Sequence, residues 1–195
     1  MDENDHSVYL TFDDGPIPES TPYILKTLRE FDVKATFFVV GDNVRKYPDL
    51  YQQILDEGHQ VGNHTFNHIS GARHTIRDYE RNVKKCAEEQ DKFRTSEDGN
   101  TALPMLFRPP HGWMRPFQYH RFKKKYRIVM WDLVTRDYSR LLSAYDVVRN
   151  VQSFARNGSI ITFHDSLKSI DKLYFALPAS LRFLKSQGYK FKTFQ

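Results

Sequence analysis

The sequence has a single cysteine, Cys86, among its 195 residues. One cysteine cannot form an internal disulfide, so a disulfide-stapled scaffold and a cysteine-rich zinc module are both excluded. A chain of this length buries roughly 70% of its extended surface on folding and needs no such staple. We therefore expect residues 1–195 to form a single domain, in which Cys86 packs as a small hydrophobic side chain.

Long apolar stretches are also absent. Runs such as Phe37–Val40 and Ile128–Trp131 are far shorter than the roughly 18 residues of a transmembrane helix, so we expect no membrane span. The polar start, Met1–Asp5, does not resemble a signal peptide. The sequence by itself assigns no compartment, and a periplasmic, cell-envelope or secreted location would need a leader ahead of these residues.

The chain lacks a strong charge of one sign. Its 29 Lys and Arg residues oppose 24 Asp and Glu residues, which leaves a net charge of +5. The densest basic clusters, Lys84-Lys85 and Lys123–Lys125, are short and fall where we expect surface helices. No basic run resembles a nucleic-acid-binding arm, so we expect no nucleic-acid partner.

Strand-like and helix-like segments alternate along most of the chain. The strand candidates are residues 7–12, 35–40, 60–63, 106–107, 127–131 and 159–163, and the helical stripes lie within 24–31, 50–55, 76–86, 145–154 and 177–184. Residues 95–101 are predicted to form the longest surface loop, and Pro178 to kink or restart the last helix. Repeated β-α units imply a parallel sheet, either a barrel or a doubly wound layer.

In both of these folds, functional residues follow the C-terminal ends of the strands. Four polar clusters do so: Asp13-Asp14, His64 with His68, Arg108 with His111, and His164-Asp165. Two histidines four residues apart and an aspartate from another strand form a His₂Asp set that can hold a metal ion. Each cluster also has an ordinary interpretation, as a solvated turn, as surface histidines or as a hydrogen-bonded structural histidine.

The segments around these clusters resemble the motifs of the polysaccharide deacetylases, the NodB-homology domains of carbohydrate esterase family 4. In chain order they are Thr11–Pro16 (TFDDGP), His64–His68 (HTFNH), Arg108–Gly112 (RPPHG), Trp131–Tyr138 (WDLVTRDY) and Phe163–Asp165 (FHD). The resemblance implies a distorted, incomplete (β/α) barrel, for which we expect seven strands. It also implies that residues 1–195 form one catalytic domain.

The resemblance implies a role for each matching position. Asp14, His64 and His68 would hold one divalent metal ion. Asp13 would be the general base, oriented by Arg108, and His164 would be the general acid, supported by Asp137. The backbone N–H of His111 would face the oxyanion. Zinc is the expected ion because imidazole and carboxylate ligands suit it, and cobalt or nickel would also suit them.

Three positions depart from the family pattern. His111 replaces a tyrosine, Tyr138 a tryptophan and Thr162 a leucine. We assign these three residues and Trp131 to substrate binding. The implied contact of His111 is through its backbone, whereas Tyr138 and Thr162 line the implied pocket for the acetate methyl group, which is therefore more polar than in the family. Trp113 is interpreted either as a sugar-stacking platform or as an ordinary loop tryptophan.

The leading hypothesis is a monomeric, metal-dependent hydrolase that removes acetyl groups from N-acetylated sugars of peptidoglycan, a chitin-like polymer or a surface glycan. In one alternative the same site hydrolyses another bond or substrate, and the protein is an O-acetyl esterase on xylan-type glycans or an amidase on a small molecule. A second alternative, of another class, is an inactive glycan-binding domain.

Overall fold

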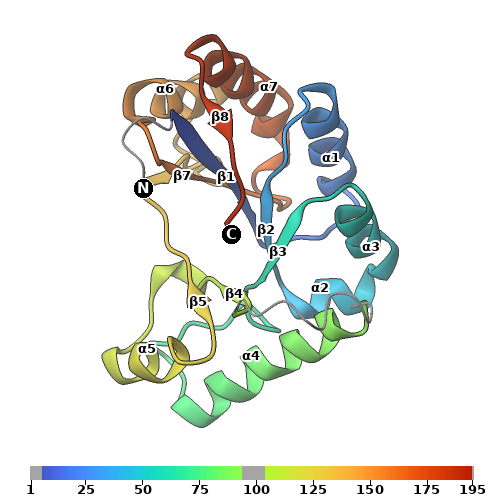
Figure 1. Ribbon diagram of the computed structural model, residues 1–195, viewed down its shortest axis with the longest axis vertical. Coiled ribbons are helices and arrows are strands. Elements are labelled where there is room, and N and C mark those ends of the chain that lie inside the picture. Colours follow the sequence, from blue (N-terminus) through green and yellow to red (C-terminus); the bar gives the residue numbers. More distant parts are fainter. Residues whose placement is uncertain (1–5, 94–103, 195) are drawn as a thin grey trace.

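The computed structural model describes residues 6–93 and 104–194, and it has an α/β fold in which helices surround one parallel sheet (Figure 1). The strands are β1 (Ser7–Asp13), β2 (Thr36–Val39), β3 (Gln60–Asn63), β4 (Leu106–Phe107), β5 (Arg127–Ile128), β6 (Leu133–Val134), β7 (Ile160–His164) and β8 (Lys190–Phe191). The helices are α1 (Thr21–Glu30), α2 (Gly41–Lys46), α3 (Pro48–Asp56), α4 (Ile76–Asp91), α5 (Pro116–Phe122), α6 (Ala144–Phe154) and α7 (Ile170–Ser186), and a short 3₁₀ turn covers Pro110–Gly112. None of the helices in these two ranges is both long and apolar enough to cross a membrane.

The sheet follows the strand order β5-β4-β3-β2-β1-β7-β6. These seven parallel strands form a partial barrel. It is incomplete because β5 and β6, the two end strands of the order, do not pair with each other among the described residues. The expected incomplete barrel of seven strands is therefore confirmed. An eighth strand, β8, pairs with the start of β1 at Ser7 and Val8. It was not predicted, because a two-residue strand leaves no alternating pattern in the sequence.

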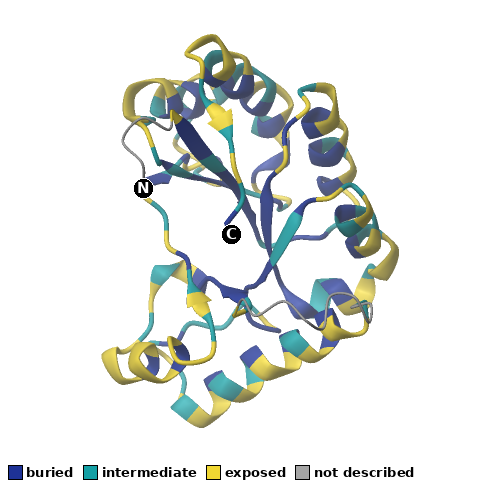
Figure 2. Ribbon diagram, viewed as in Figure 1, coloured by how far each residue is buried: buried dark blue, intermediate teal, exposed yellow. Residues whose placement is uncertain are grey.

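The hydrophobic core lies between the sheet and its helices, and buried stripes run along the inner side of each helix (Figure 2). In α7, for example, Leu177, Leu181 and Leu184 are fully buried. The Phe12 ring of β1 lies 5.1 Å from the Phe37 ring on the neighbouring strand β2. β1 lies inside the sheet between β2 and β7, and it ends at the first of the four polar clusters.

Cys86 lies on the buried stripe of α4 and is fully buried. Burial raises the pKa of its thiol to about 12, so the thiol stays protonated at neutral pH. The prediction that Cys86 packs as a small hydrophobic side chain is confirmed.

Several sequence expectations need correction. The strand expected over 127–131 ends at Ile128, because the carbonyl groups of Val129 and Met130 accept hydrogen bonds from the Arg108 side chain. Lys123–Lys125 lie in the turn after α5 and not in a helix. Helix α7 continues through Pro178 without a restart. The loop expected over 95–101 lies outside the described residues.

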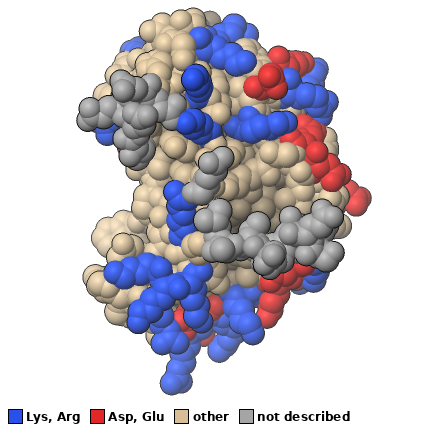
Figure 3. Space-filling view, in the orientation of Figure 1, with Lys and Arg blue, Asp and Glu red and all other residues tan. Residues whose placement is uncertain are grey.

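The basic side chains, scattered in the sequence, are brought together by folding. Figure 3 shows Lys and Arg gathering on the lower part of the visible face, over α4 and α5. A hollow of about 410 Å³ between these helices is lined by Arg81, Lys84, Arg121 and Lys125 together with Glu80, Phe122 and Tyr126. Three of these cations form ion pairs, with Asp78, Glu88 and Glu80, so much of the local charge is compensated.

Candidate active site

A cavity of about 670 Å³ opens where the C-terminal ends of the central strands meet. Its walls include nine of the eleven predicted site residues, namely Asp13, Asp14, His64, His68, His111, Trp131, Tyr138, Thr162 and His164. The other two, Arg108 and Asp137, are fully buried behind the walls. The residues that follow the strand ends therefore lie together, and folding brings all five motifs to one cavity.

The three predicted metal ligands lie within reach of one ion. Their ligand atoms are all within 4.8 Å of one another, and Oδ1 of Asp14 is 3.6 Å from Nε2 of His64 and 3.2 Å from Nε2 of His68. Ligands about 2.0–2.2 Å from a tetrahedral ion are about 3.3–3.6 Å apart, so both separations suit a shared metal. Oδ1 of Asp14 is buried and has no hydrogen-bond partner among the described residues. The donor set and this unpaired oxygen fit a divalent cation.

The protonation states also suit metal binding. Burial lowers the pKa of His64 to about 4 despite the charges of Asp13 and Asp14. The Nδ1 atom of neutral His64 donates to the carbonyl oxygen of Arg108 at 2.8 Å, which leaves the lone pair of Nε2 facing Asp14. Burial opposes ionisation of Asp14, but the adjacent His68 ring and the charges of His64, His68 and His164 hold the pKa of Asp14 well below its usual range.

The backbone around the cavity is unusually rich in left-handed conformations. Among non-glycine residues, φ is positive at Asp14 (84°), Thr65 (65°), His68 (53°), His111 (59°) and Arg136 (60°). Each lies in a loop that follows a strand and carries site residues. Such conformations cost free energy and persist where the surrounding structure holds them. Here they aim two of the three proposed ligands, Asp14 and His68, at the same point.

Asp13 is held by a buried arginine. Nη1 of Arg108 donates to Oδ1 of Asp13 at 2.6 Å, and the same nitrogen lies 2.8 Å from Oγ1 of Thr11 and 3.2 Å from Oγ1 of Thr162. Burial lowers the pKa of Arg108, and the Asp13 carboxylate opposes this effect. One carboxylate oxygen of Asp13 is thereby fixed, while the side chain still reaches the cavity wall.

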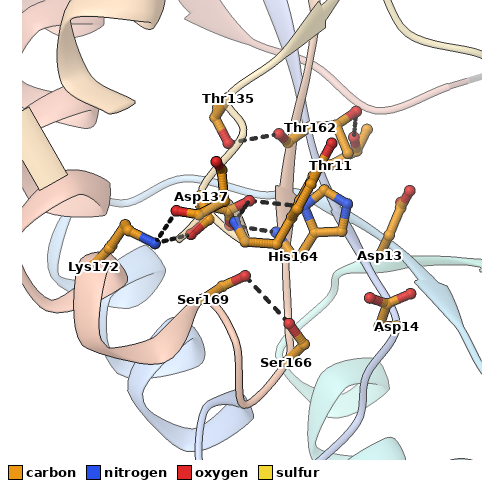
Figure 4. A network of polar contacts seen from close by, with 12 residues as sticks. Thr11, Asp13, Asp14, Thr135, Asp137, Thr162, His164, Ser166, Ser169 and Lys172 are labelled. Atoms are coloured by element: carbon orange, nitrogen blue, oxygen red, sulfur yellow. Dashed lines mark hydrogen bonds and ion pairs between the residues drawn. The ribbon is translucent and has the colours of Figure 1, made fainter. Parts of the chain in front are cut away.

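His164 ends β7 beside Asp13, and its ring points toward that residue in Figure 4. Nδ1 of His164 lies 2.8 Å from Oδ1 of Asp137, and its backbone N–H donates to Oδ2 at 2.7 Å. Burial alone would lower the pKa of His164, but the hydrogen bond and charge of Asp137, with the charges of Asp13 and Asp14, raise it to about 9. The imidazole is therefore protonated at neutral pH and can donate a proton from Nε2.

The loop that carries Asp137 is anchored from α7. Nζ of Lys172 donates to the carbonyl oxygens of Asp137 and Ser139 at 2.7 and 2.8 Å (Figure 4). Tyr138, between these two residues, places its ring edge-on to the His164 ring at 4.7 Å. His164, Asp137 and the adjacent cavity wall at Tyr138 are thus one connected unit.

The three positions that depart from the family pattern all line the cavity. The Thr162 hydroxyl lies 3.0 Å from the Thr11 hydroxyl, so it belongs to the polar network around Arg108. His111 packs its ring against His68 at 4.7 Å. Gly112 lies so close to Trp131 that an added Cβ would be 2.6 Å from that ring. Trp113 is 66% exposed and does not line the cavity, which is consistent with a loop tryptophan.

Sequence reasoning gave no role to Asp165, although it was grouped with His164. Asp165 is buried and accepts hydrogen bonds from the hydroxyl groups of Ser20 (2.5 Å) and Thr21 (2.6 Å). Burial raises the pKa of Asp165 to about 7, although these hydrogen bonds oppose the shift. A Cβ at Gly15 would lie 1.9 Å from its Oδ2, so only glycine fits beside it. Asp165 therefore fixes the turn that follows Asp13 and Asp14.

Asn43 and Lys172 were also missed. The Asn43 side-chain amide donates to the carbonyl oxygen of Asp14 at 2.8 Å and steadies that ligand. Asn43 lies only four residues beyond the end of β2, so the strand-end rule could have found it. Lys172 lies inside α7, and no local pattern indicated that it reaches Asp137.

Comparisons with known proteins agree with this geometry. A sequence profile of the family described as polysaccharide deacetylase matches residues 1–117. A peptidoglycan-N-acetylglucosamine deacetylase of Bacillus cereus is 33% identical over 193 residues, which cover 97% of this chain and 87% of that protein. A chitooligosaccharide deacetylase of Rhizobium leguminosarum bv. trifolii is 35% identical over 166 residues, covering 83% of this chain and 73% of the relative.

The fold is also similar to that of a solved enzyme. A crystal structure of a peptidoglycan N-acetylglucosamine deacetylase, in complex with a naphthalenyl N-oxidanyl-benzamide, superposes with a TM-score of 0.84 at 34% identity. The match covers 97% of this chain and 86% of that one. The likeness therefore extends well beyond the motifs.

Proposed function

This chain belongs to the polysaccharide deacetylase family, and we propose that it removes acetyl groups from the N-acetylglucosamine units of a polymeric glycan of the peptidoglycan or chitin type. The observation that carries the proposal is the arrangement in one cavity of an unpaired Asp14 oxygen facing two imidazoles, an Asp13 held by Arg108 and a His164 held by Asp137. Residues 1–195 would act as one catalytic domain and as a monomer.

We assign Asp14, His64 and His68 as the ligands of one divalent ion, zinc being preferred and cobalt or nickel also suiting the donor set. Such an ion, when bound, polarises a carbonyl group and lowers the pKa of water toward neutrality. Zn²⁺ commonly takes two histidines and one carboxylate in catalytic sites and leaves a further position open.

Side chains of the protein would carry out the proton transfers of the hydrolysis. Asp13, held at one oxygen by Arg108, takes a proton from the attacking water with its other oxygen. An amine is a poor leaving group as an anion, so His164 donates its Nε2 proton to the sugar nitrogen as the C–N bond breaks. Asp137 keeps that imidazole charged and oriented. The backbone N–H of His111 faces the negative charge that develops on the former carbonyl oxygen.

The test is acetate release from a panel of substrates: N-acetylglucosamine oligomers, peptidoglycan and O-acetylated xylan. We expect release from the first two, which are the substrate types named for the two relatives. Preference for acetylated xylan would instead favour the O-acetyl esterase alternative. A metal-loaded, folded protein that binds these glycans and releases no acetate would be the inactive binding domain.

A further inference from the structure

A pair of exposed aromatic rings lies on α6 and α7, the two helices that follow β6 and β7, whose last residues line the cavity. Tyr145, in the first turn of α6, and Phe175, near the start of α7, have ring centroids 4.6 Å apart. Tyr145 is 68% exposed and Phe175 is 40% exposed. We call these two residues the aromatic shelf. Exposed apolar surface of this kind is costly to keep in water and commonly marks a binding surface.

The shelf is joined to the catalytic unit through α7. Lys172 holds the backbone of Asp137 and Ser139, and Phe175 follows it by one helical turn, about 4.5 Å along the helix axis. Between Asp137 and α6 the chain carries Tyr138, whose ring lines the cavity, and Leu141, which is 91% exposed. Tyr138 on the cavity wall and Tyr145 on the shelf are thus only seven positions apart along the chain.

We propose that the aromatic shelf binds sugar units of the same glycan chain that lie beyond the unit in the catalytic cavity. This proposal rests on the function proposed above. A pyranose ring has an apolar face of C–H groups and a polar rim, so it can cover an aromatic ring while its hydroxyl groups stay in water. The shelf lies on the cavity's side of the molecule because α6 and α7 both begin after strand ends that form the site. A polymer leaving the cavity past Tyr138 would meet it.

Binding at a distance from the reacting bond affects long substrates and spares short ones. We therefore compare acetate release from an N-acetylglucosamine dimer and a hexamer, using Tyr145→Ala, Phe175→Ala and Tyr145→Phe. Each alanine substitution should lower kcat/KM for the hexamer by roughly 2- to 10-fold, the range expected for one aromatic contact, and leave the dimer unchanged. Tyr145→Phe should retain hexamer activity, because it keeps the ring.

Phe154→Ala is the matched control. Phe154 is also on α6 and is 63% exposed, but it lies in the last turn, at the end away from the cavity. It should leave kcat/KM unchanged for both lengths. Equal losses on dimer and hexamer in the shelf variants would overturn the proposal, since the shelf would then act by supporting the catalytic loop. Unchanged hexamer activity in both variants would also overturn it.

A binding measurement separates this proposal from the proposed function. Titration calorimetry with the hexamer, in a chelator that stops turnover, should give a weaker Kd for Tyr145→Ala and Phe175→Ala than for the parent or for Phe154→Ala. If the parent released no acetate from any glycan but showed this ring-dependent binding, the proposed function would fail and the shelf would stand. If the Kd did not depend on the two rings, the shelf would fail even in an active enzyme.

Discussion

The two halves of the site satisfy their buried polar atoms in different ways. In the half with the proposed metal ligands, Oδ1 of Asp14 is buried and has no hydrogen-bond partner within the described part of the chain. In the other half, both carboxylate oxygens of Asp137 accept hydrogen bonds, from Nδ1 and the backbone N–H of His164. An unpaired buried oxygen costs on the order of 1–3 kcal/mol. An added cation would therefore complete the first half, whereas the second is complete within the protein.

The backbone shows the same difference. Asp14 and His68 adopt positive φ angles, which cost a non-glycine residue roughly 1–2 kcal/mol each. His164 instead continues a regular strand, paired with Asp13. In the proposed function a bound ion would stabilise the strained half, so we expect that half to respond to metal removal. The hydrogen-bonded half should respond to pH.

Loss of a metal ligand should have the largest effect. His64→Ala or His68→Ala should abolish metal binding and reduce acetate release to background, because two ligands hold an ion far more weakly than three. Metal content per protein and acetate release measure the two effects. The control is His120→Ala, since His120 is exposed on α5 and should leave both quantities unchanged. Full deacetylase activity in metal-free His64→Ala would contradict the assignment.

Substitutions of Asp13 and Asp14 should have different effects, because Asp13 is the proposed base and Asp14 a proposed metal ligand. Asp13→Asn should keep the metal and lower kcat by roughly 10² to 10⁴, the usual effect of losing a proton-transfer group. Asp14→Asn should weaken metal binding, because it replaces the carboxylate whose oxygen faces both imidazoles. Metal affinity by competition with a chelating dye distinguishes the two. Equal loss of metal from both variants would show that the division of roles is wrong.

His164→Ala should affect amide and ester substrates unequally. Release of acetate from an N-acetylglucosamine oligomer should fall by about 10² or more, because the amine must be protonated as it leaves. An aryl acetate should be much less affected, since an aryl oxide leaves readily without a proton. Asp137→Asn should give a milder form of the same pattern. Comparison of kcat/KM on both substrates is the measurement, and an equal loss on both would mean that His164 only maintains the site.

The smallest effect should appear in stability against pH. The folded-state pKa of His164, about 9, lies above the ordinary histidine value of 6.5, so its protonation stabilises the fold fully below about pH 6.5 and ever less as pH rises through 9. The contribution is on the order of 3 kcal/mol. Urea unfolding in chelator should therefore show His164→Gln destabilised relative to the parent at pH 6, with the gap closing by pH 10. If the difference in unfolding free energy between the parent and His164→Gln stayed constant from pH 6 to pH 10, the ion pair of His164 with Asp137 would not be its cause.

Much of the site followed from local sequence. The strand-end rule and the motif resemblance identified Asp14, His64 and His68, and the structure brings their ligand atoms together. Asn43, Asp165 and Lys172 were given no role. Asn43 follows β2 closely enough for the strand-end rule to have found it, whereas Asp165 and Lys172 act through hydrogen bonds to residues distant in the sequence. Asp165, for example, accepts from Ser20, which is 145 positions away. Apolar periodicity carries no information about such a pairing.

The sequence by itself determined the alternation of strands and helices, because the spacing of apolar residues is a local property that burial against a sheet enforces. It also determined which residue types follow each strand. Only the tertiary structure decided that Arg108 reaches Asp13 from 95 positions away, that β5 stops where its neighbouring carbonyls bind that arginine, and that Tyr145 meets Phe175. The reason is physical: hydrogen bonds and ring contacts require separations of a few ångströms, and sheet register and helix packing set those separations between distant parts of the chain.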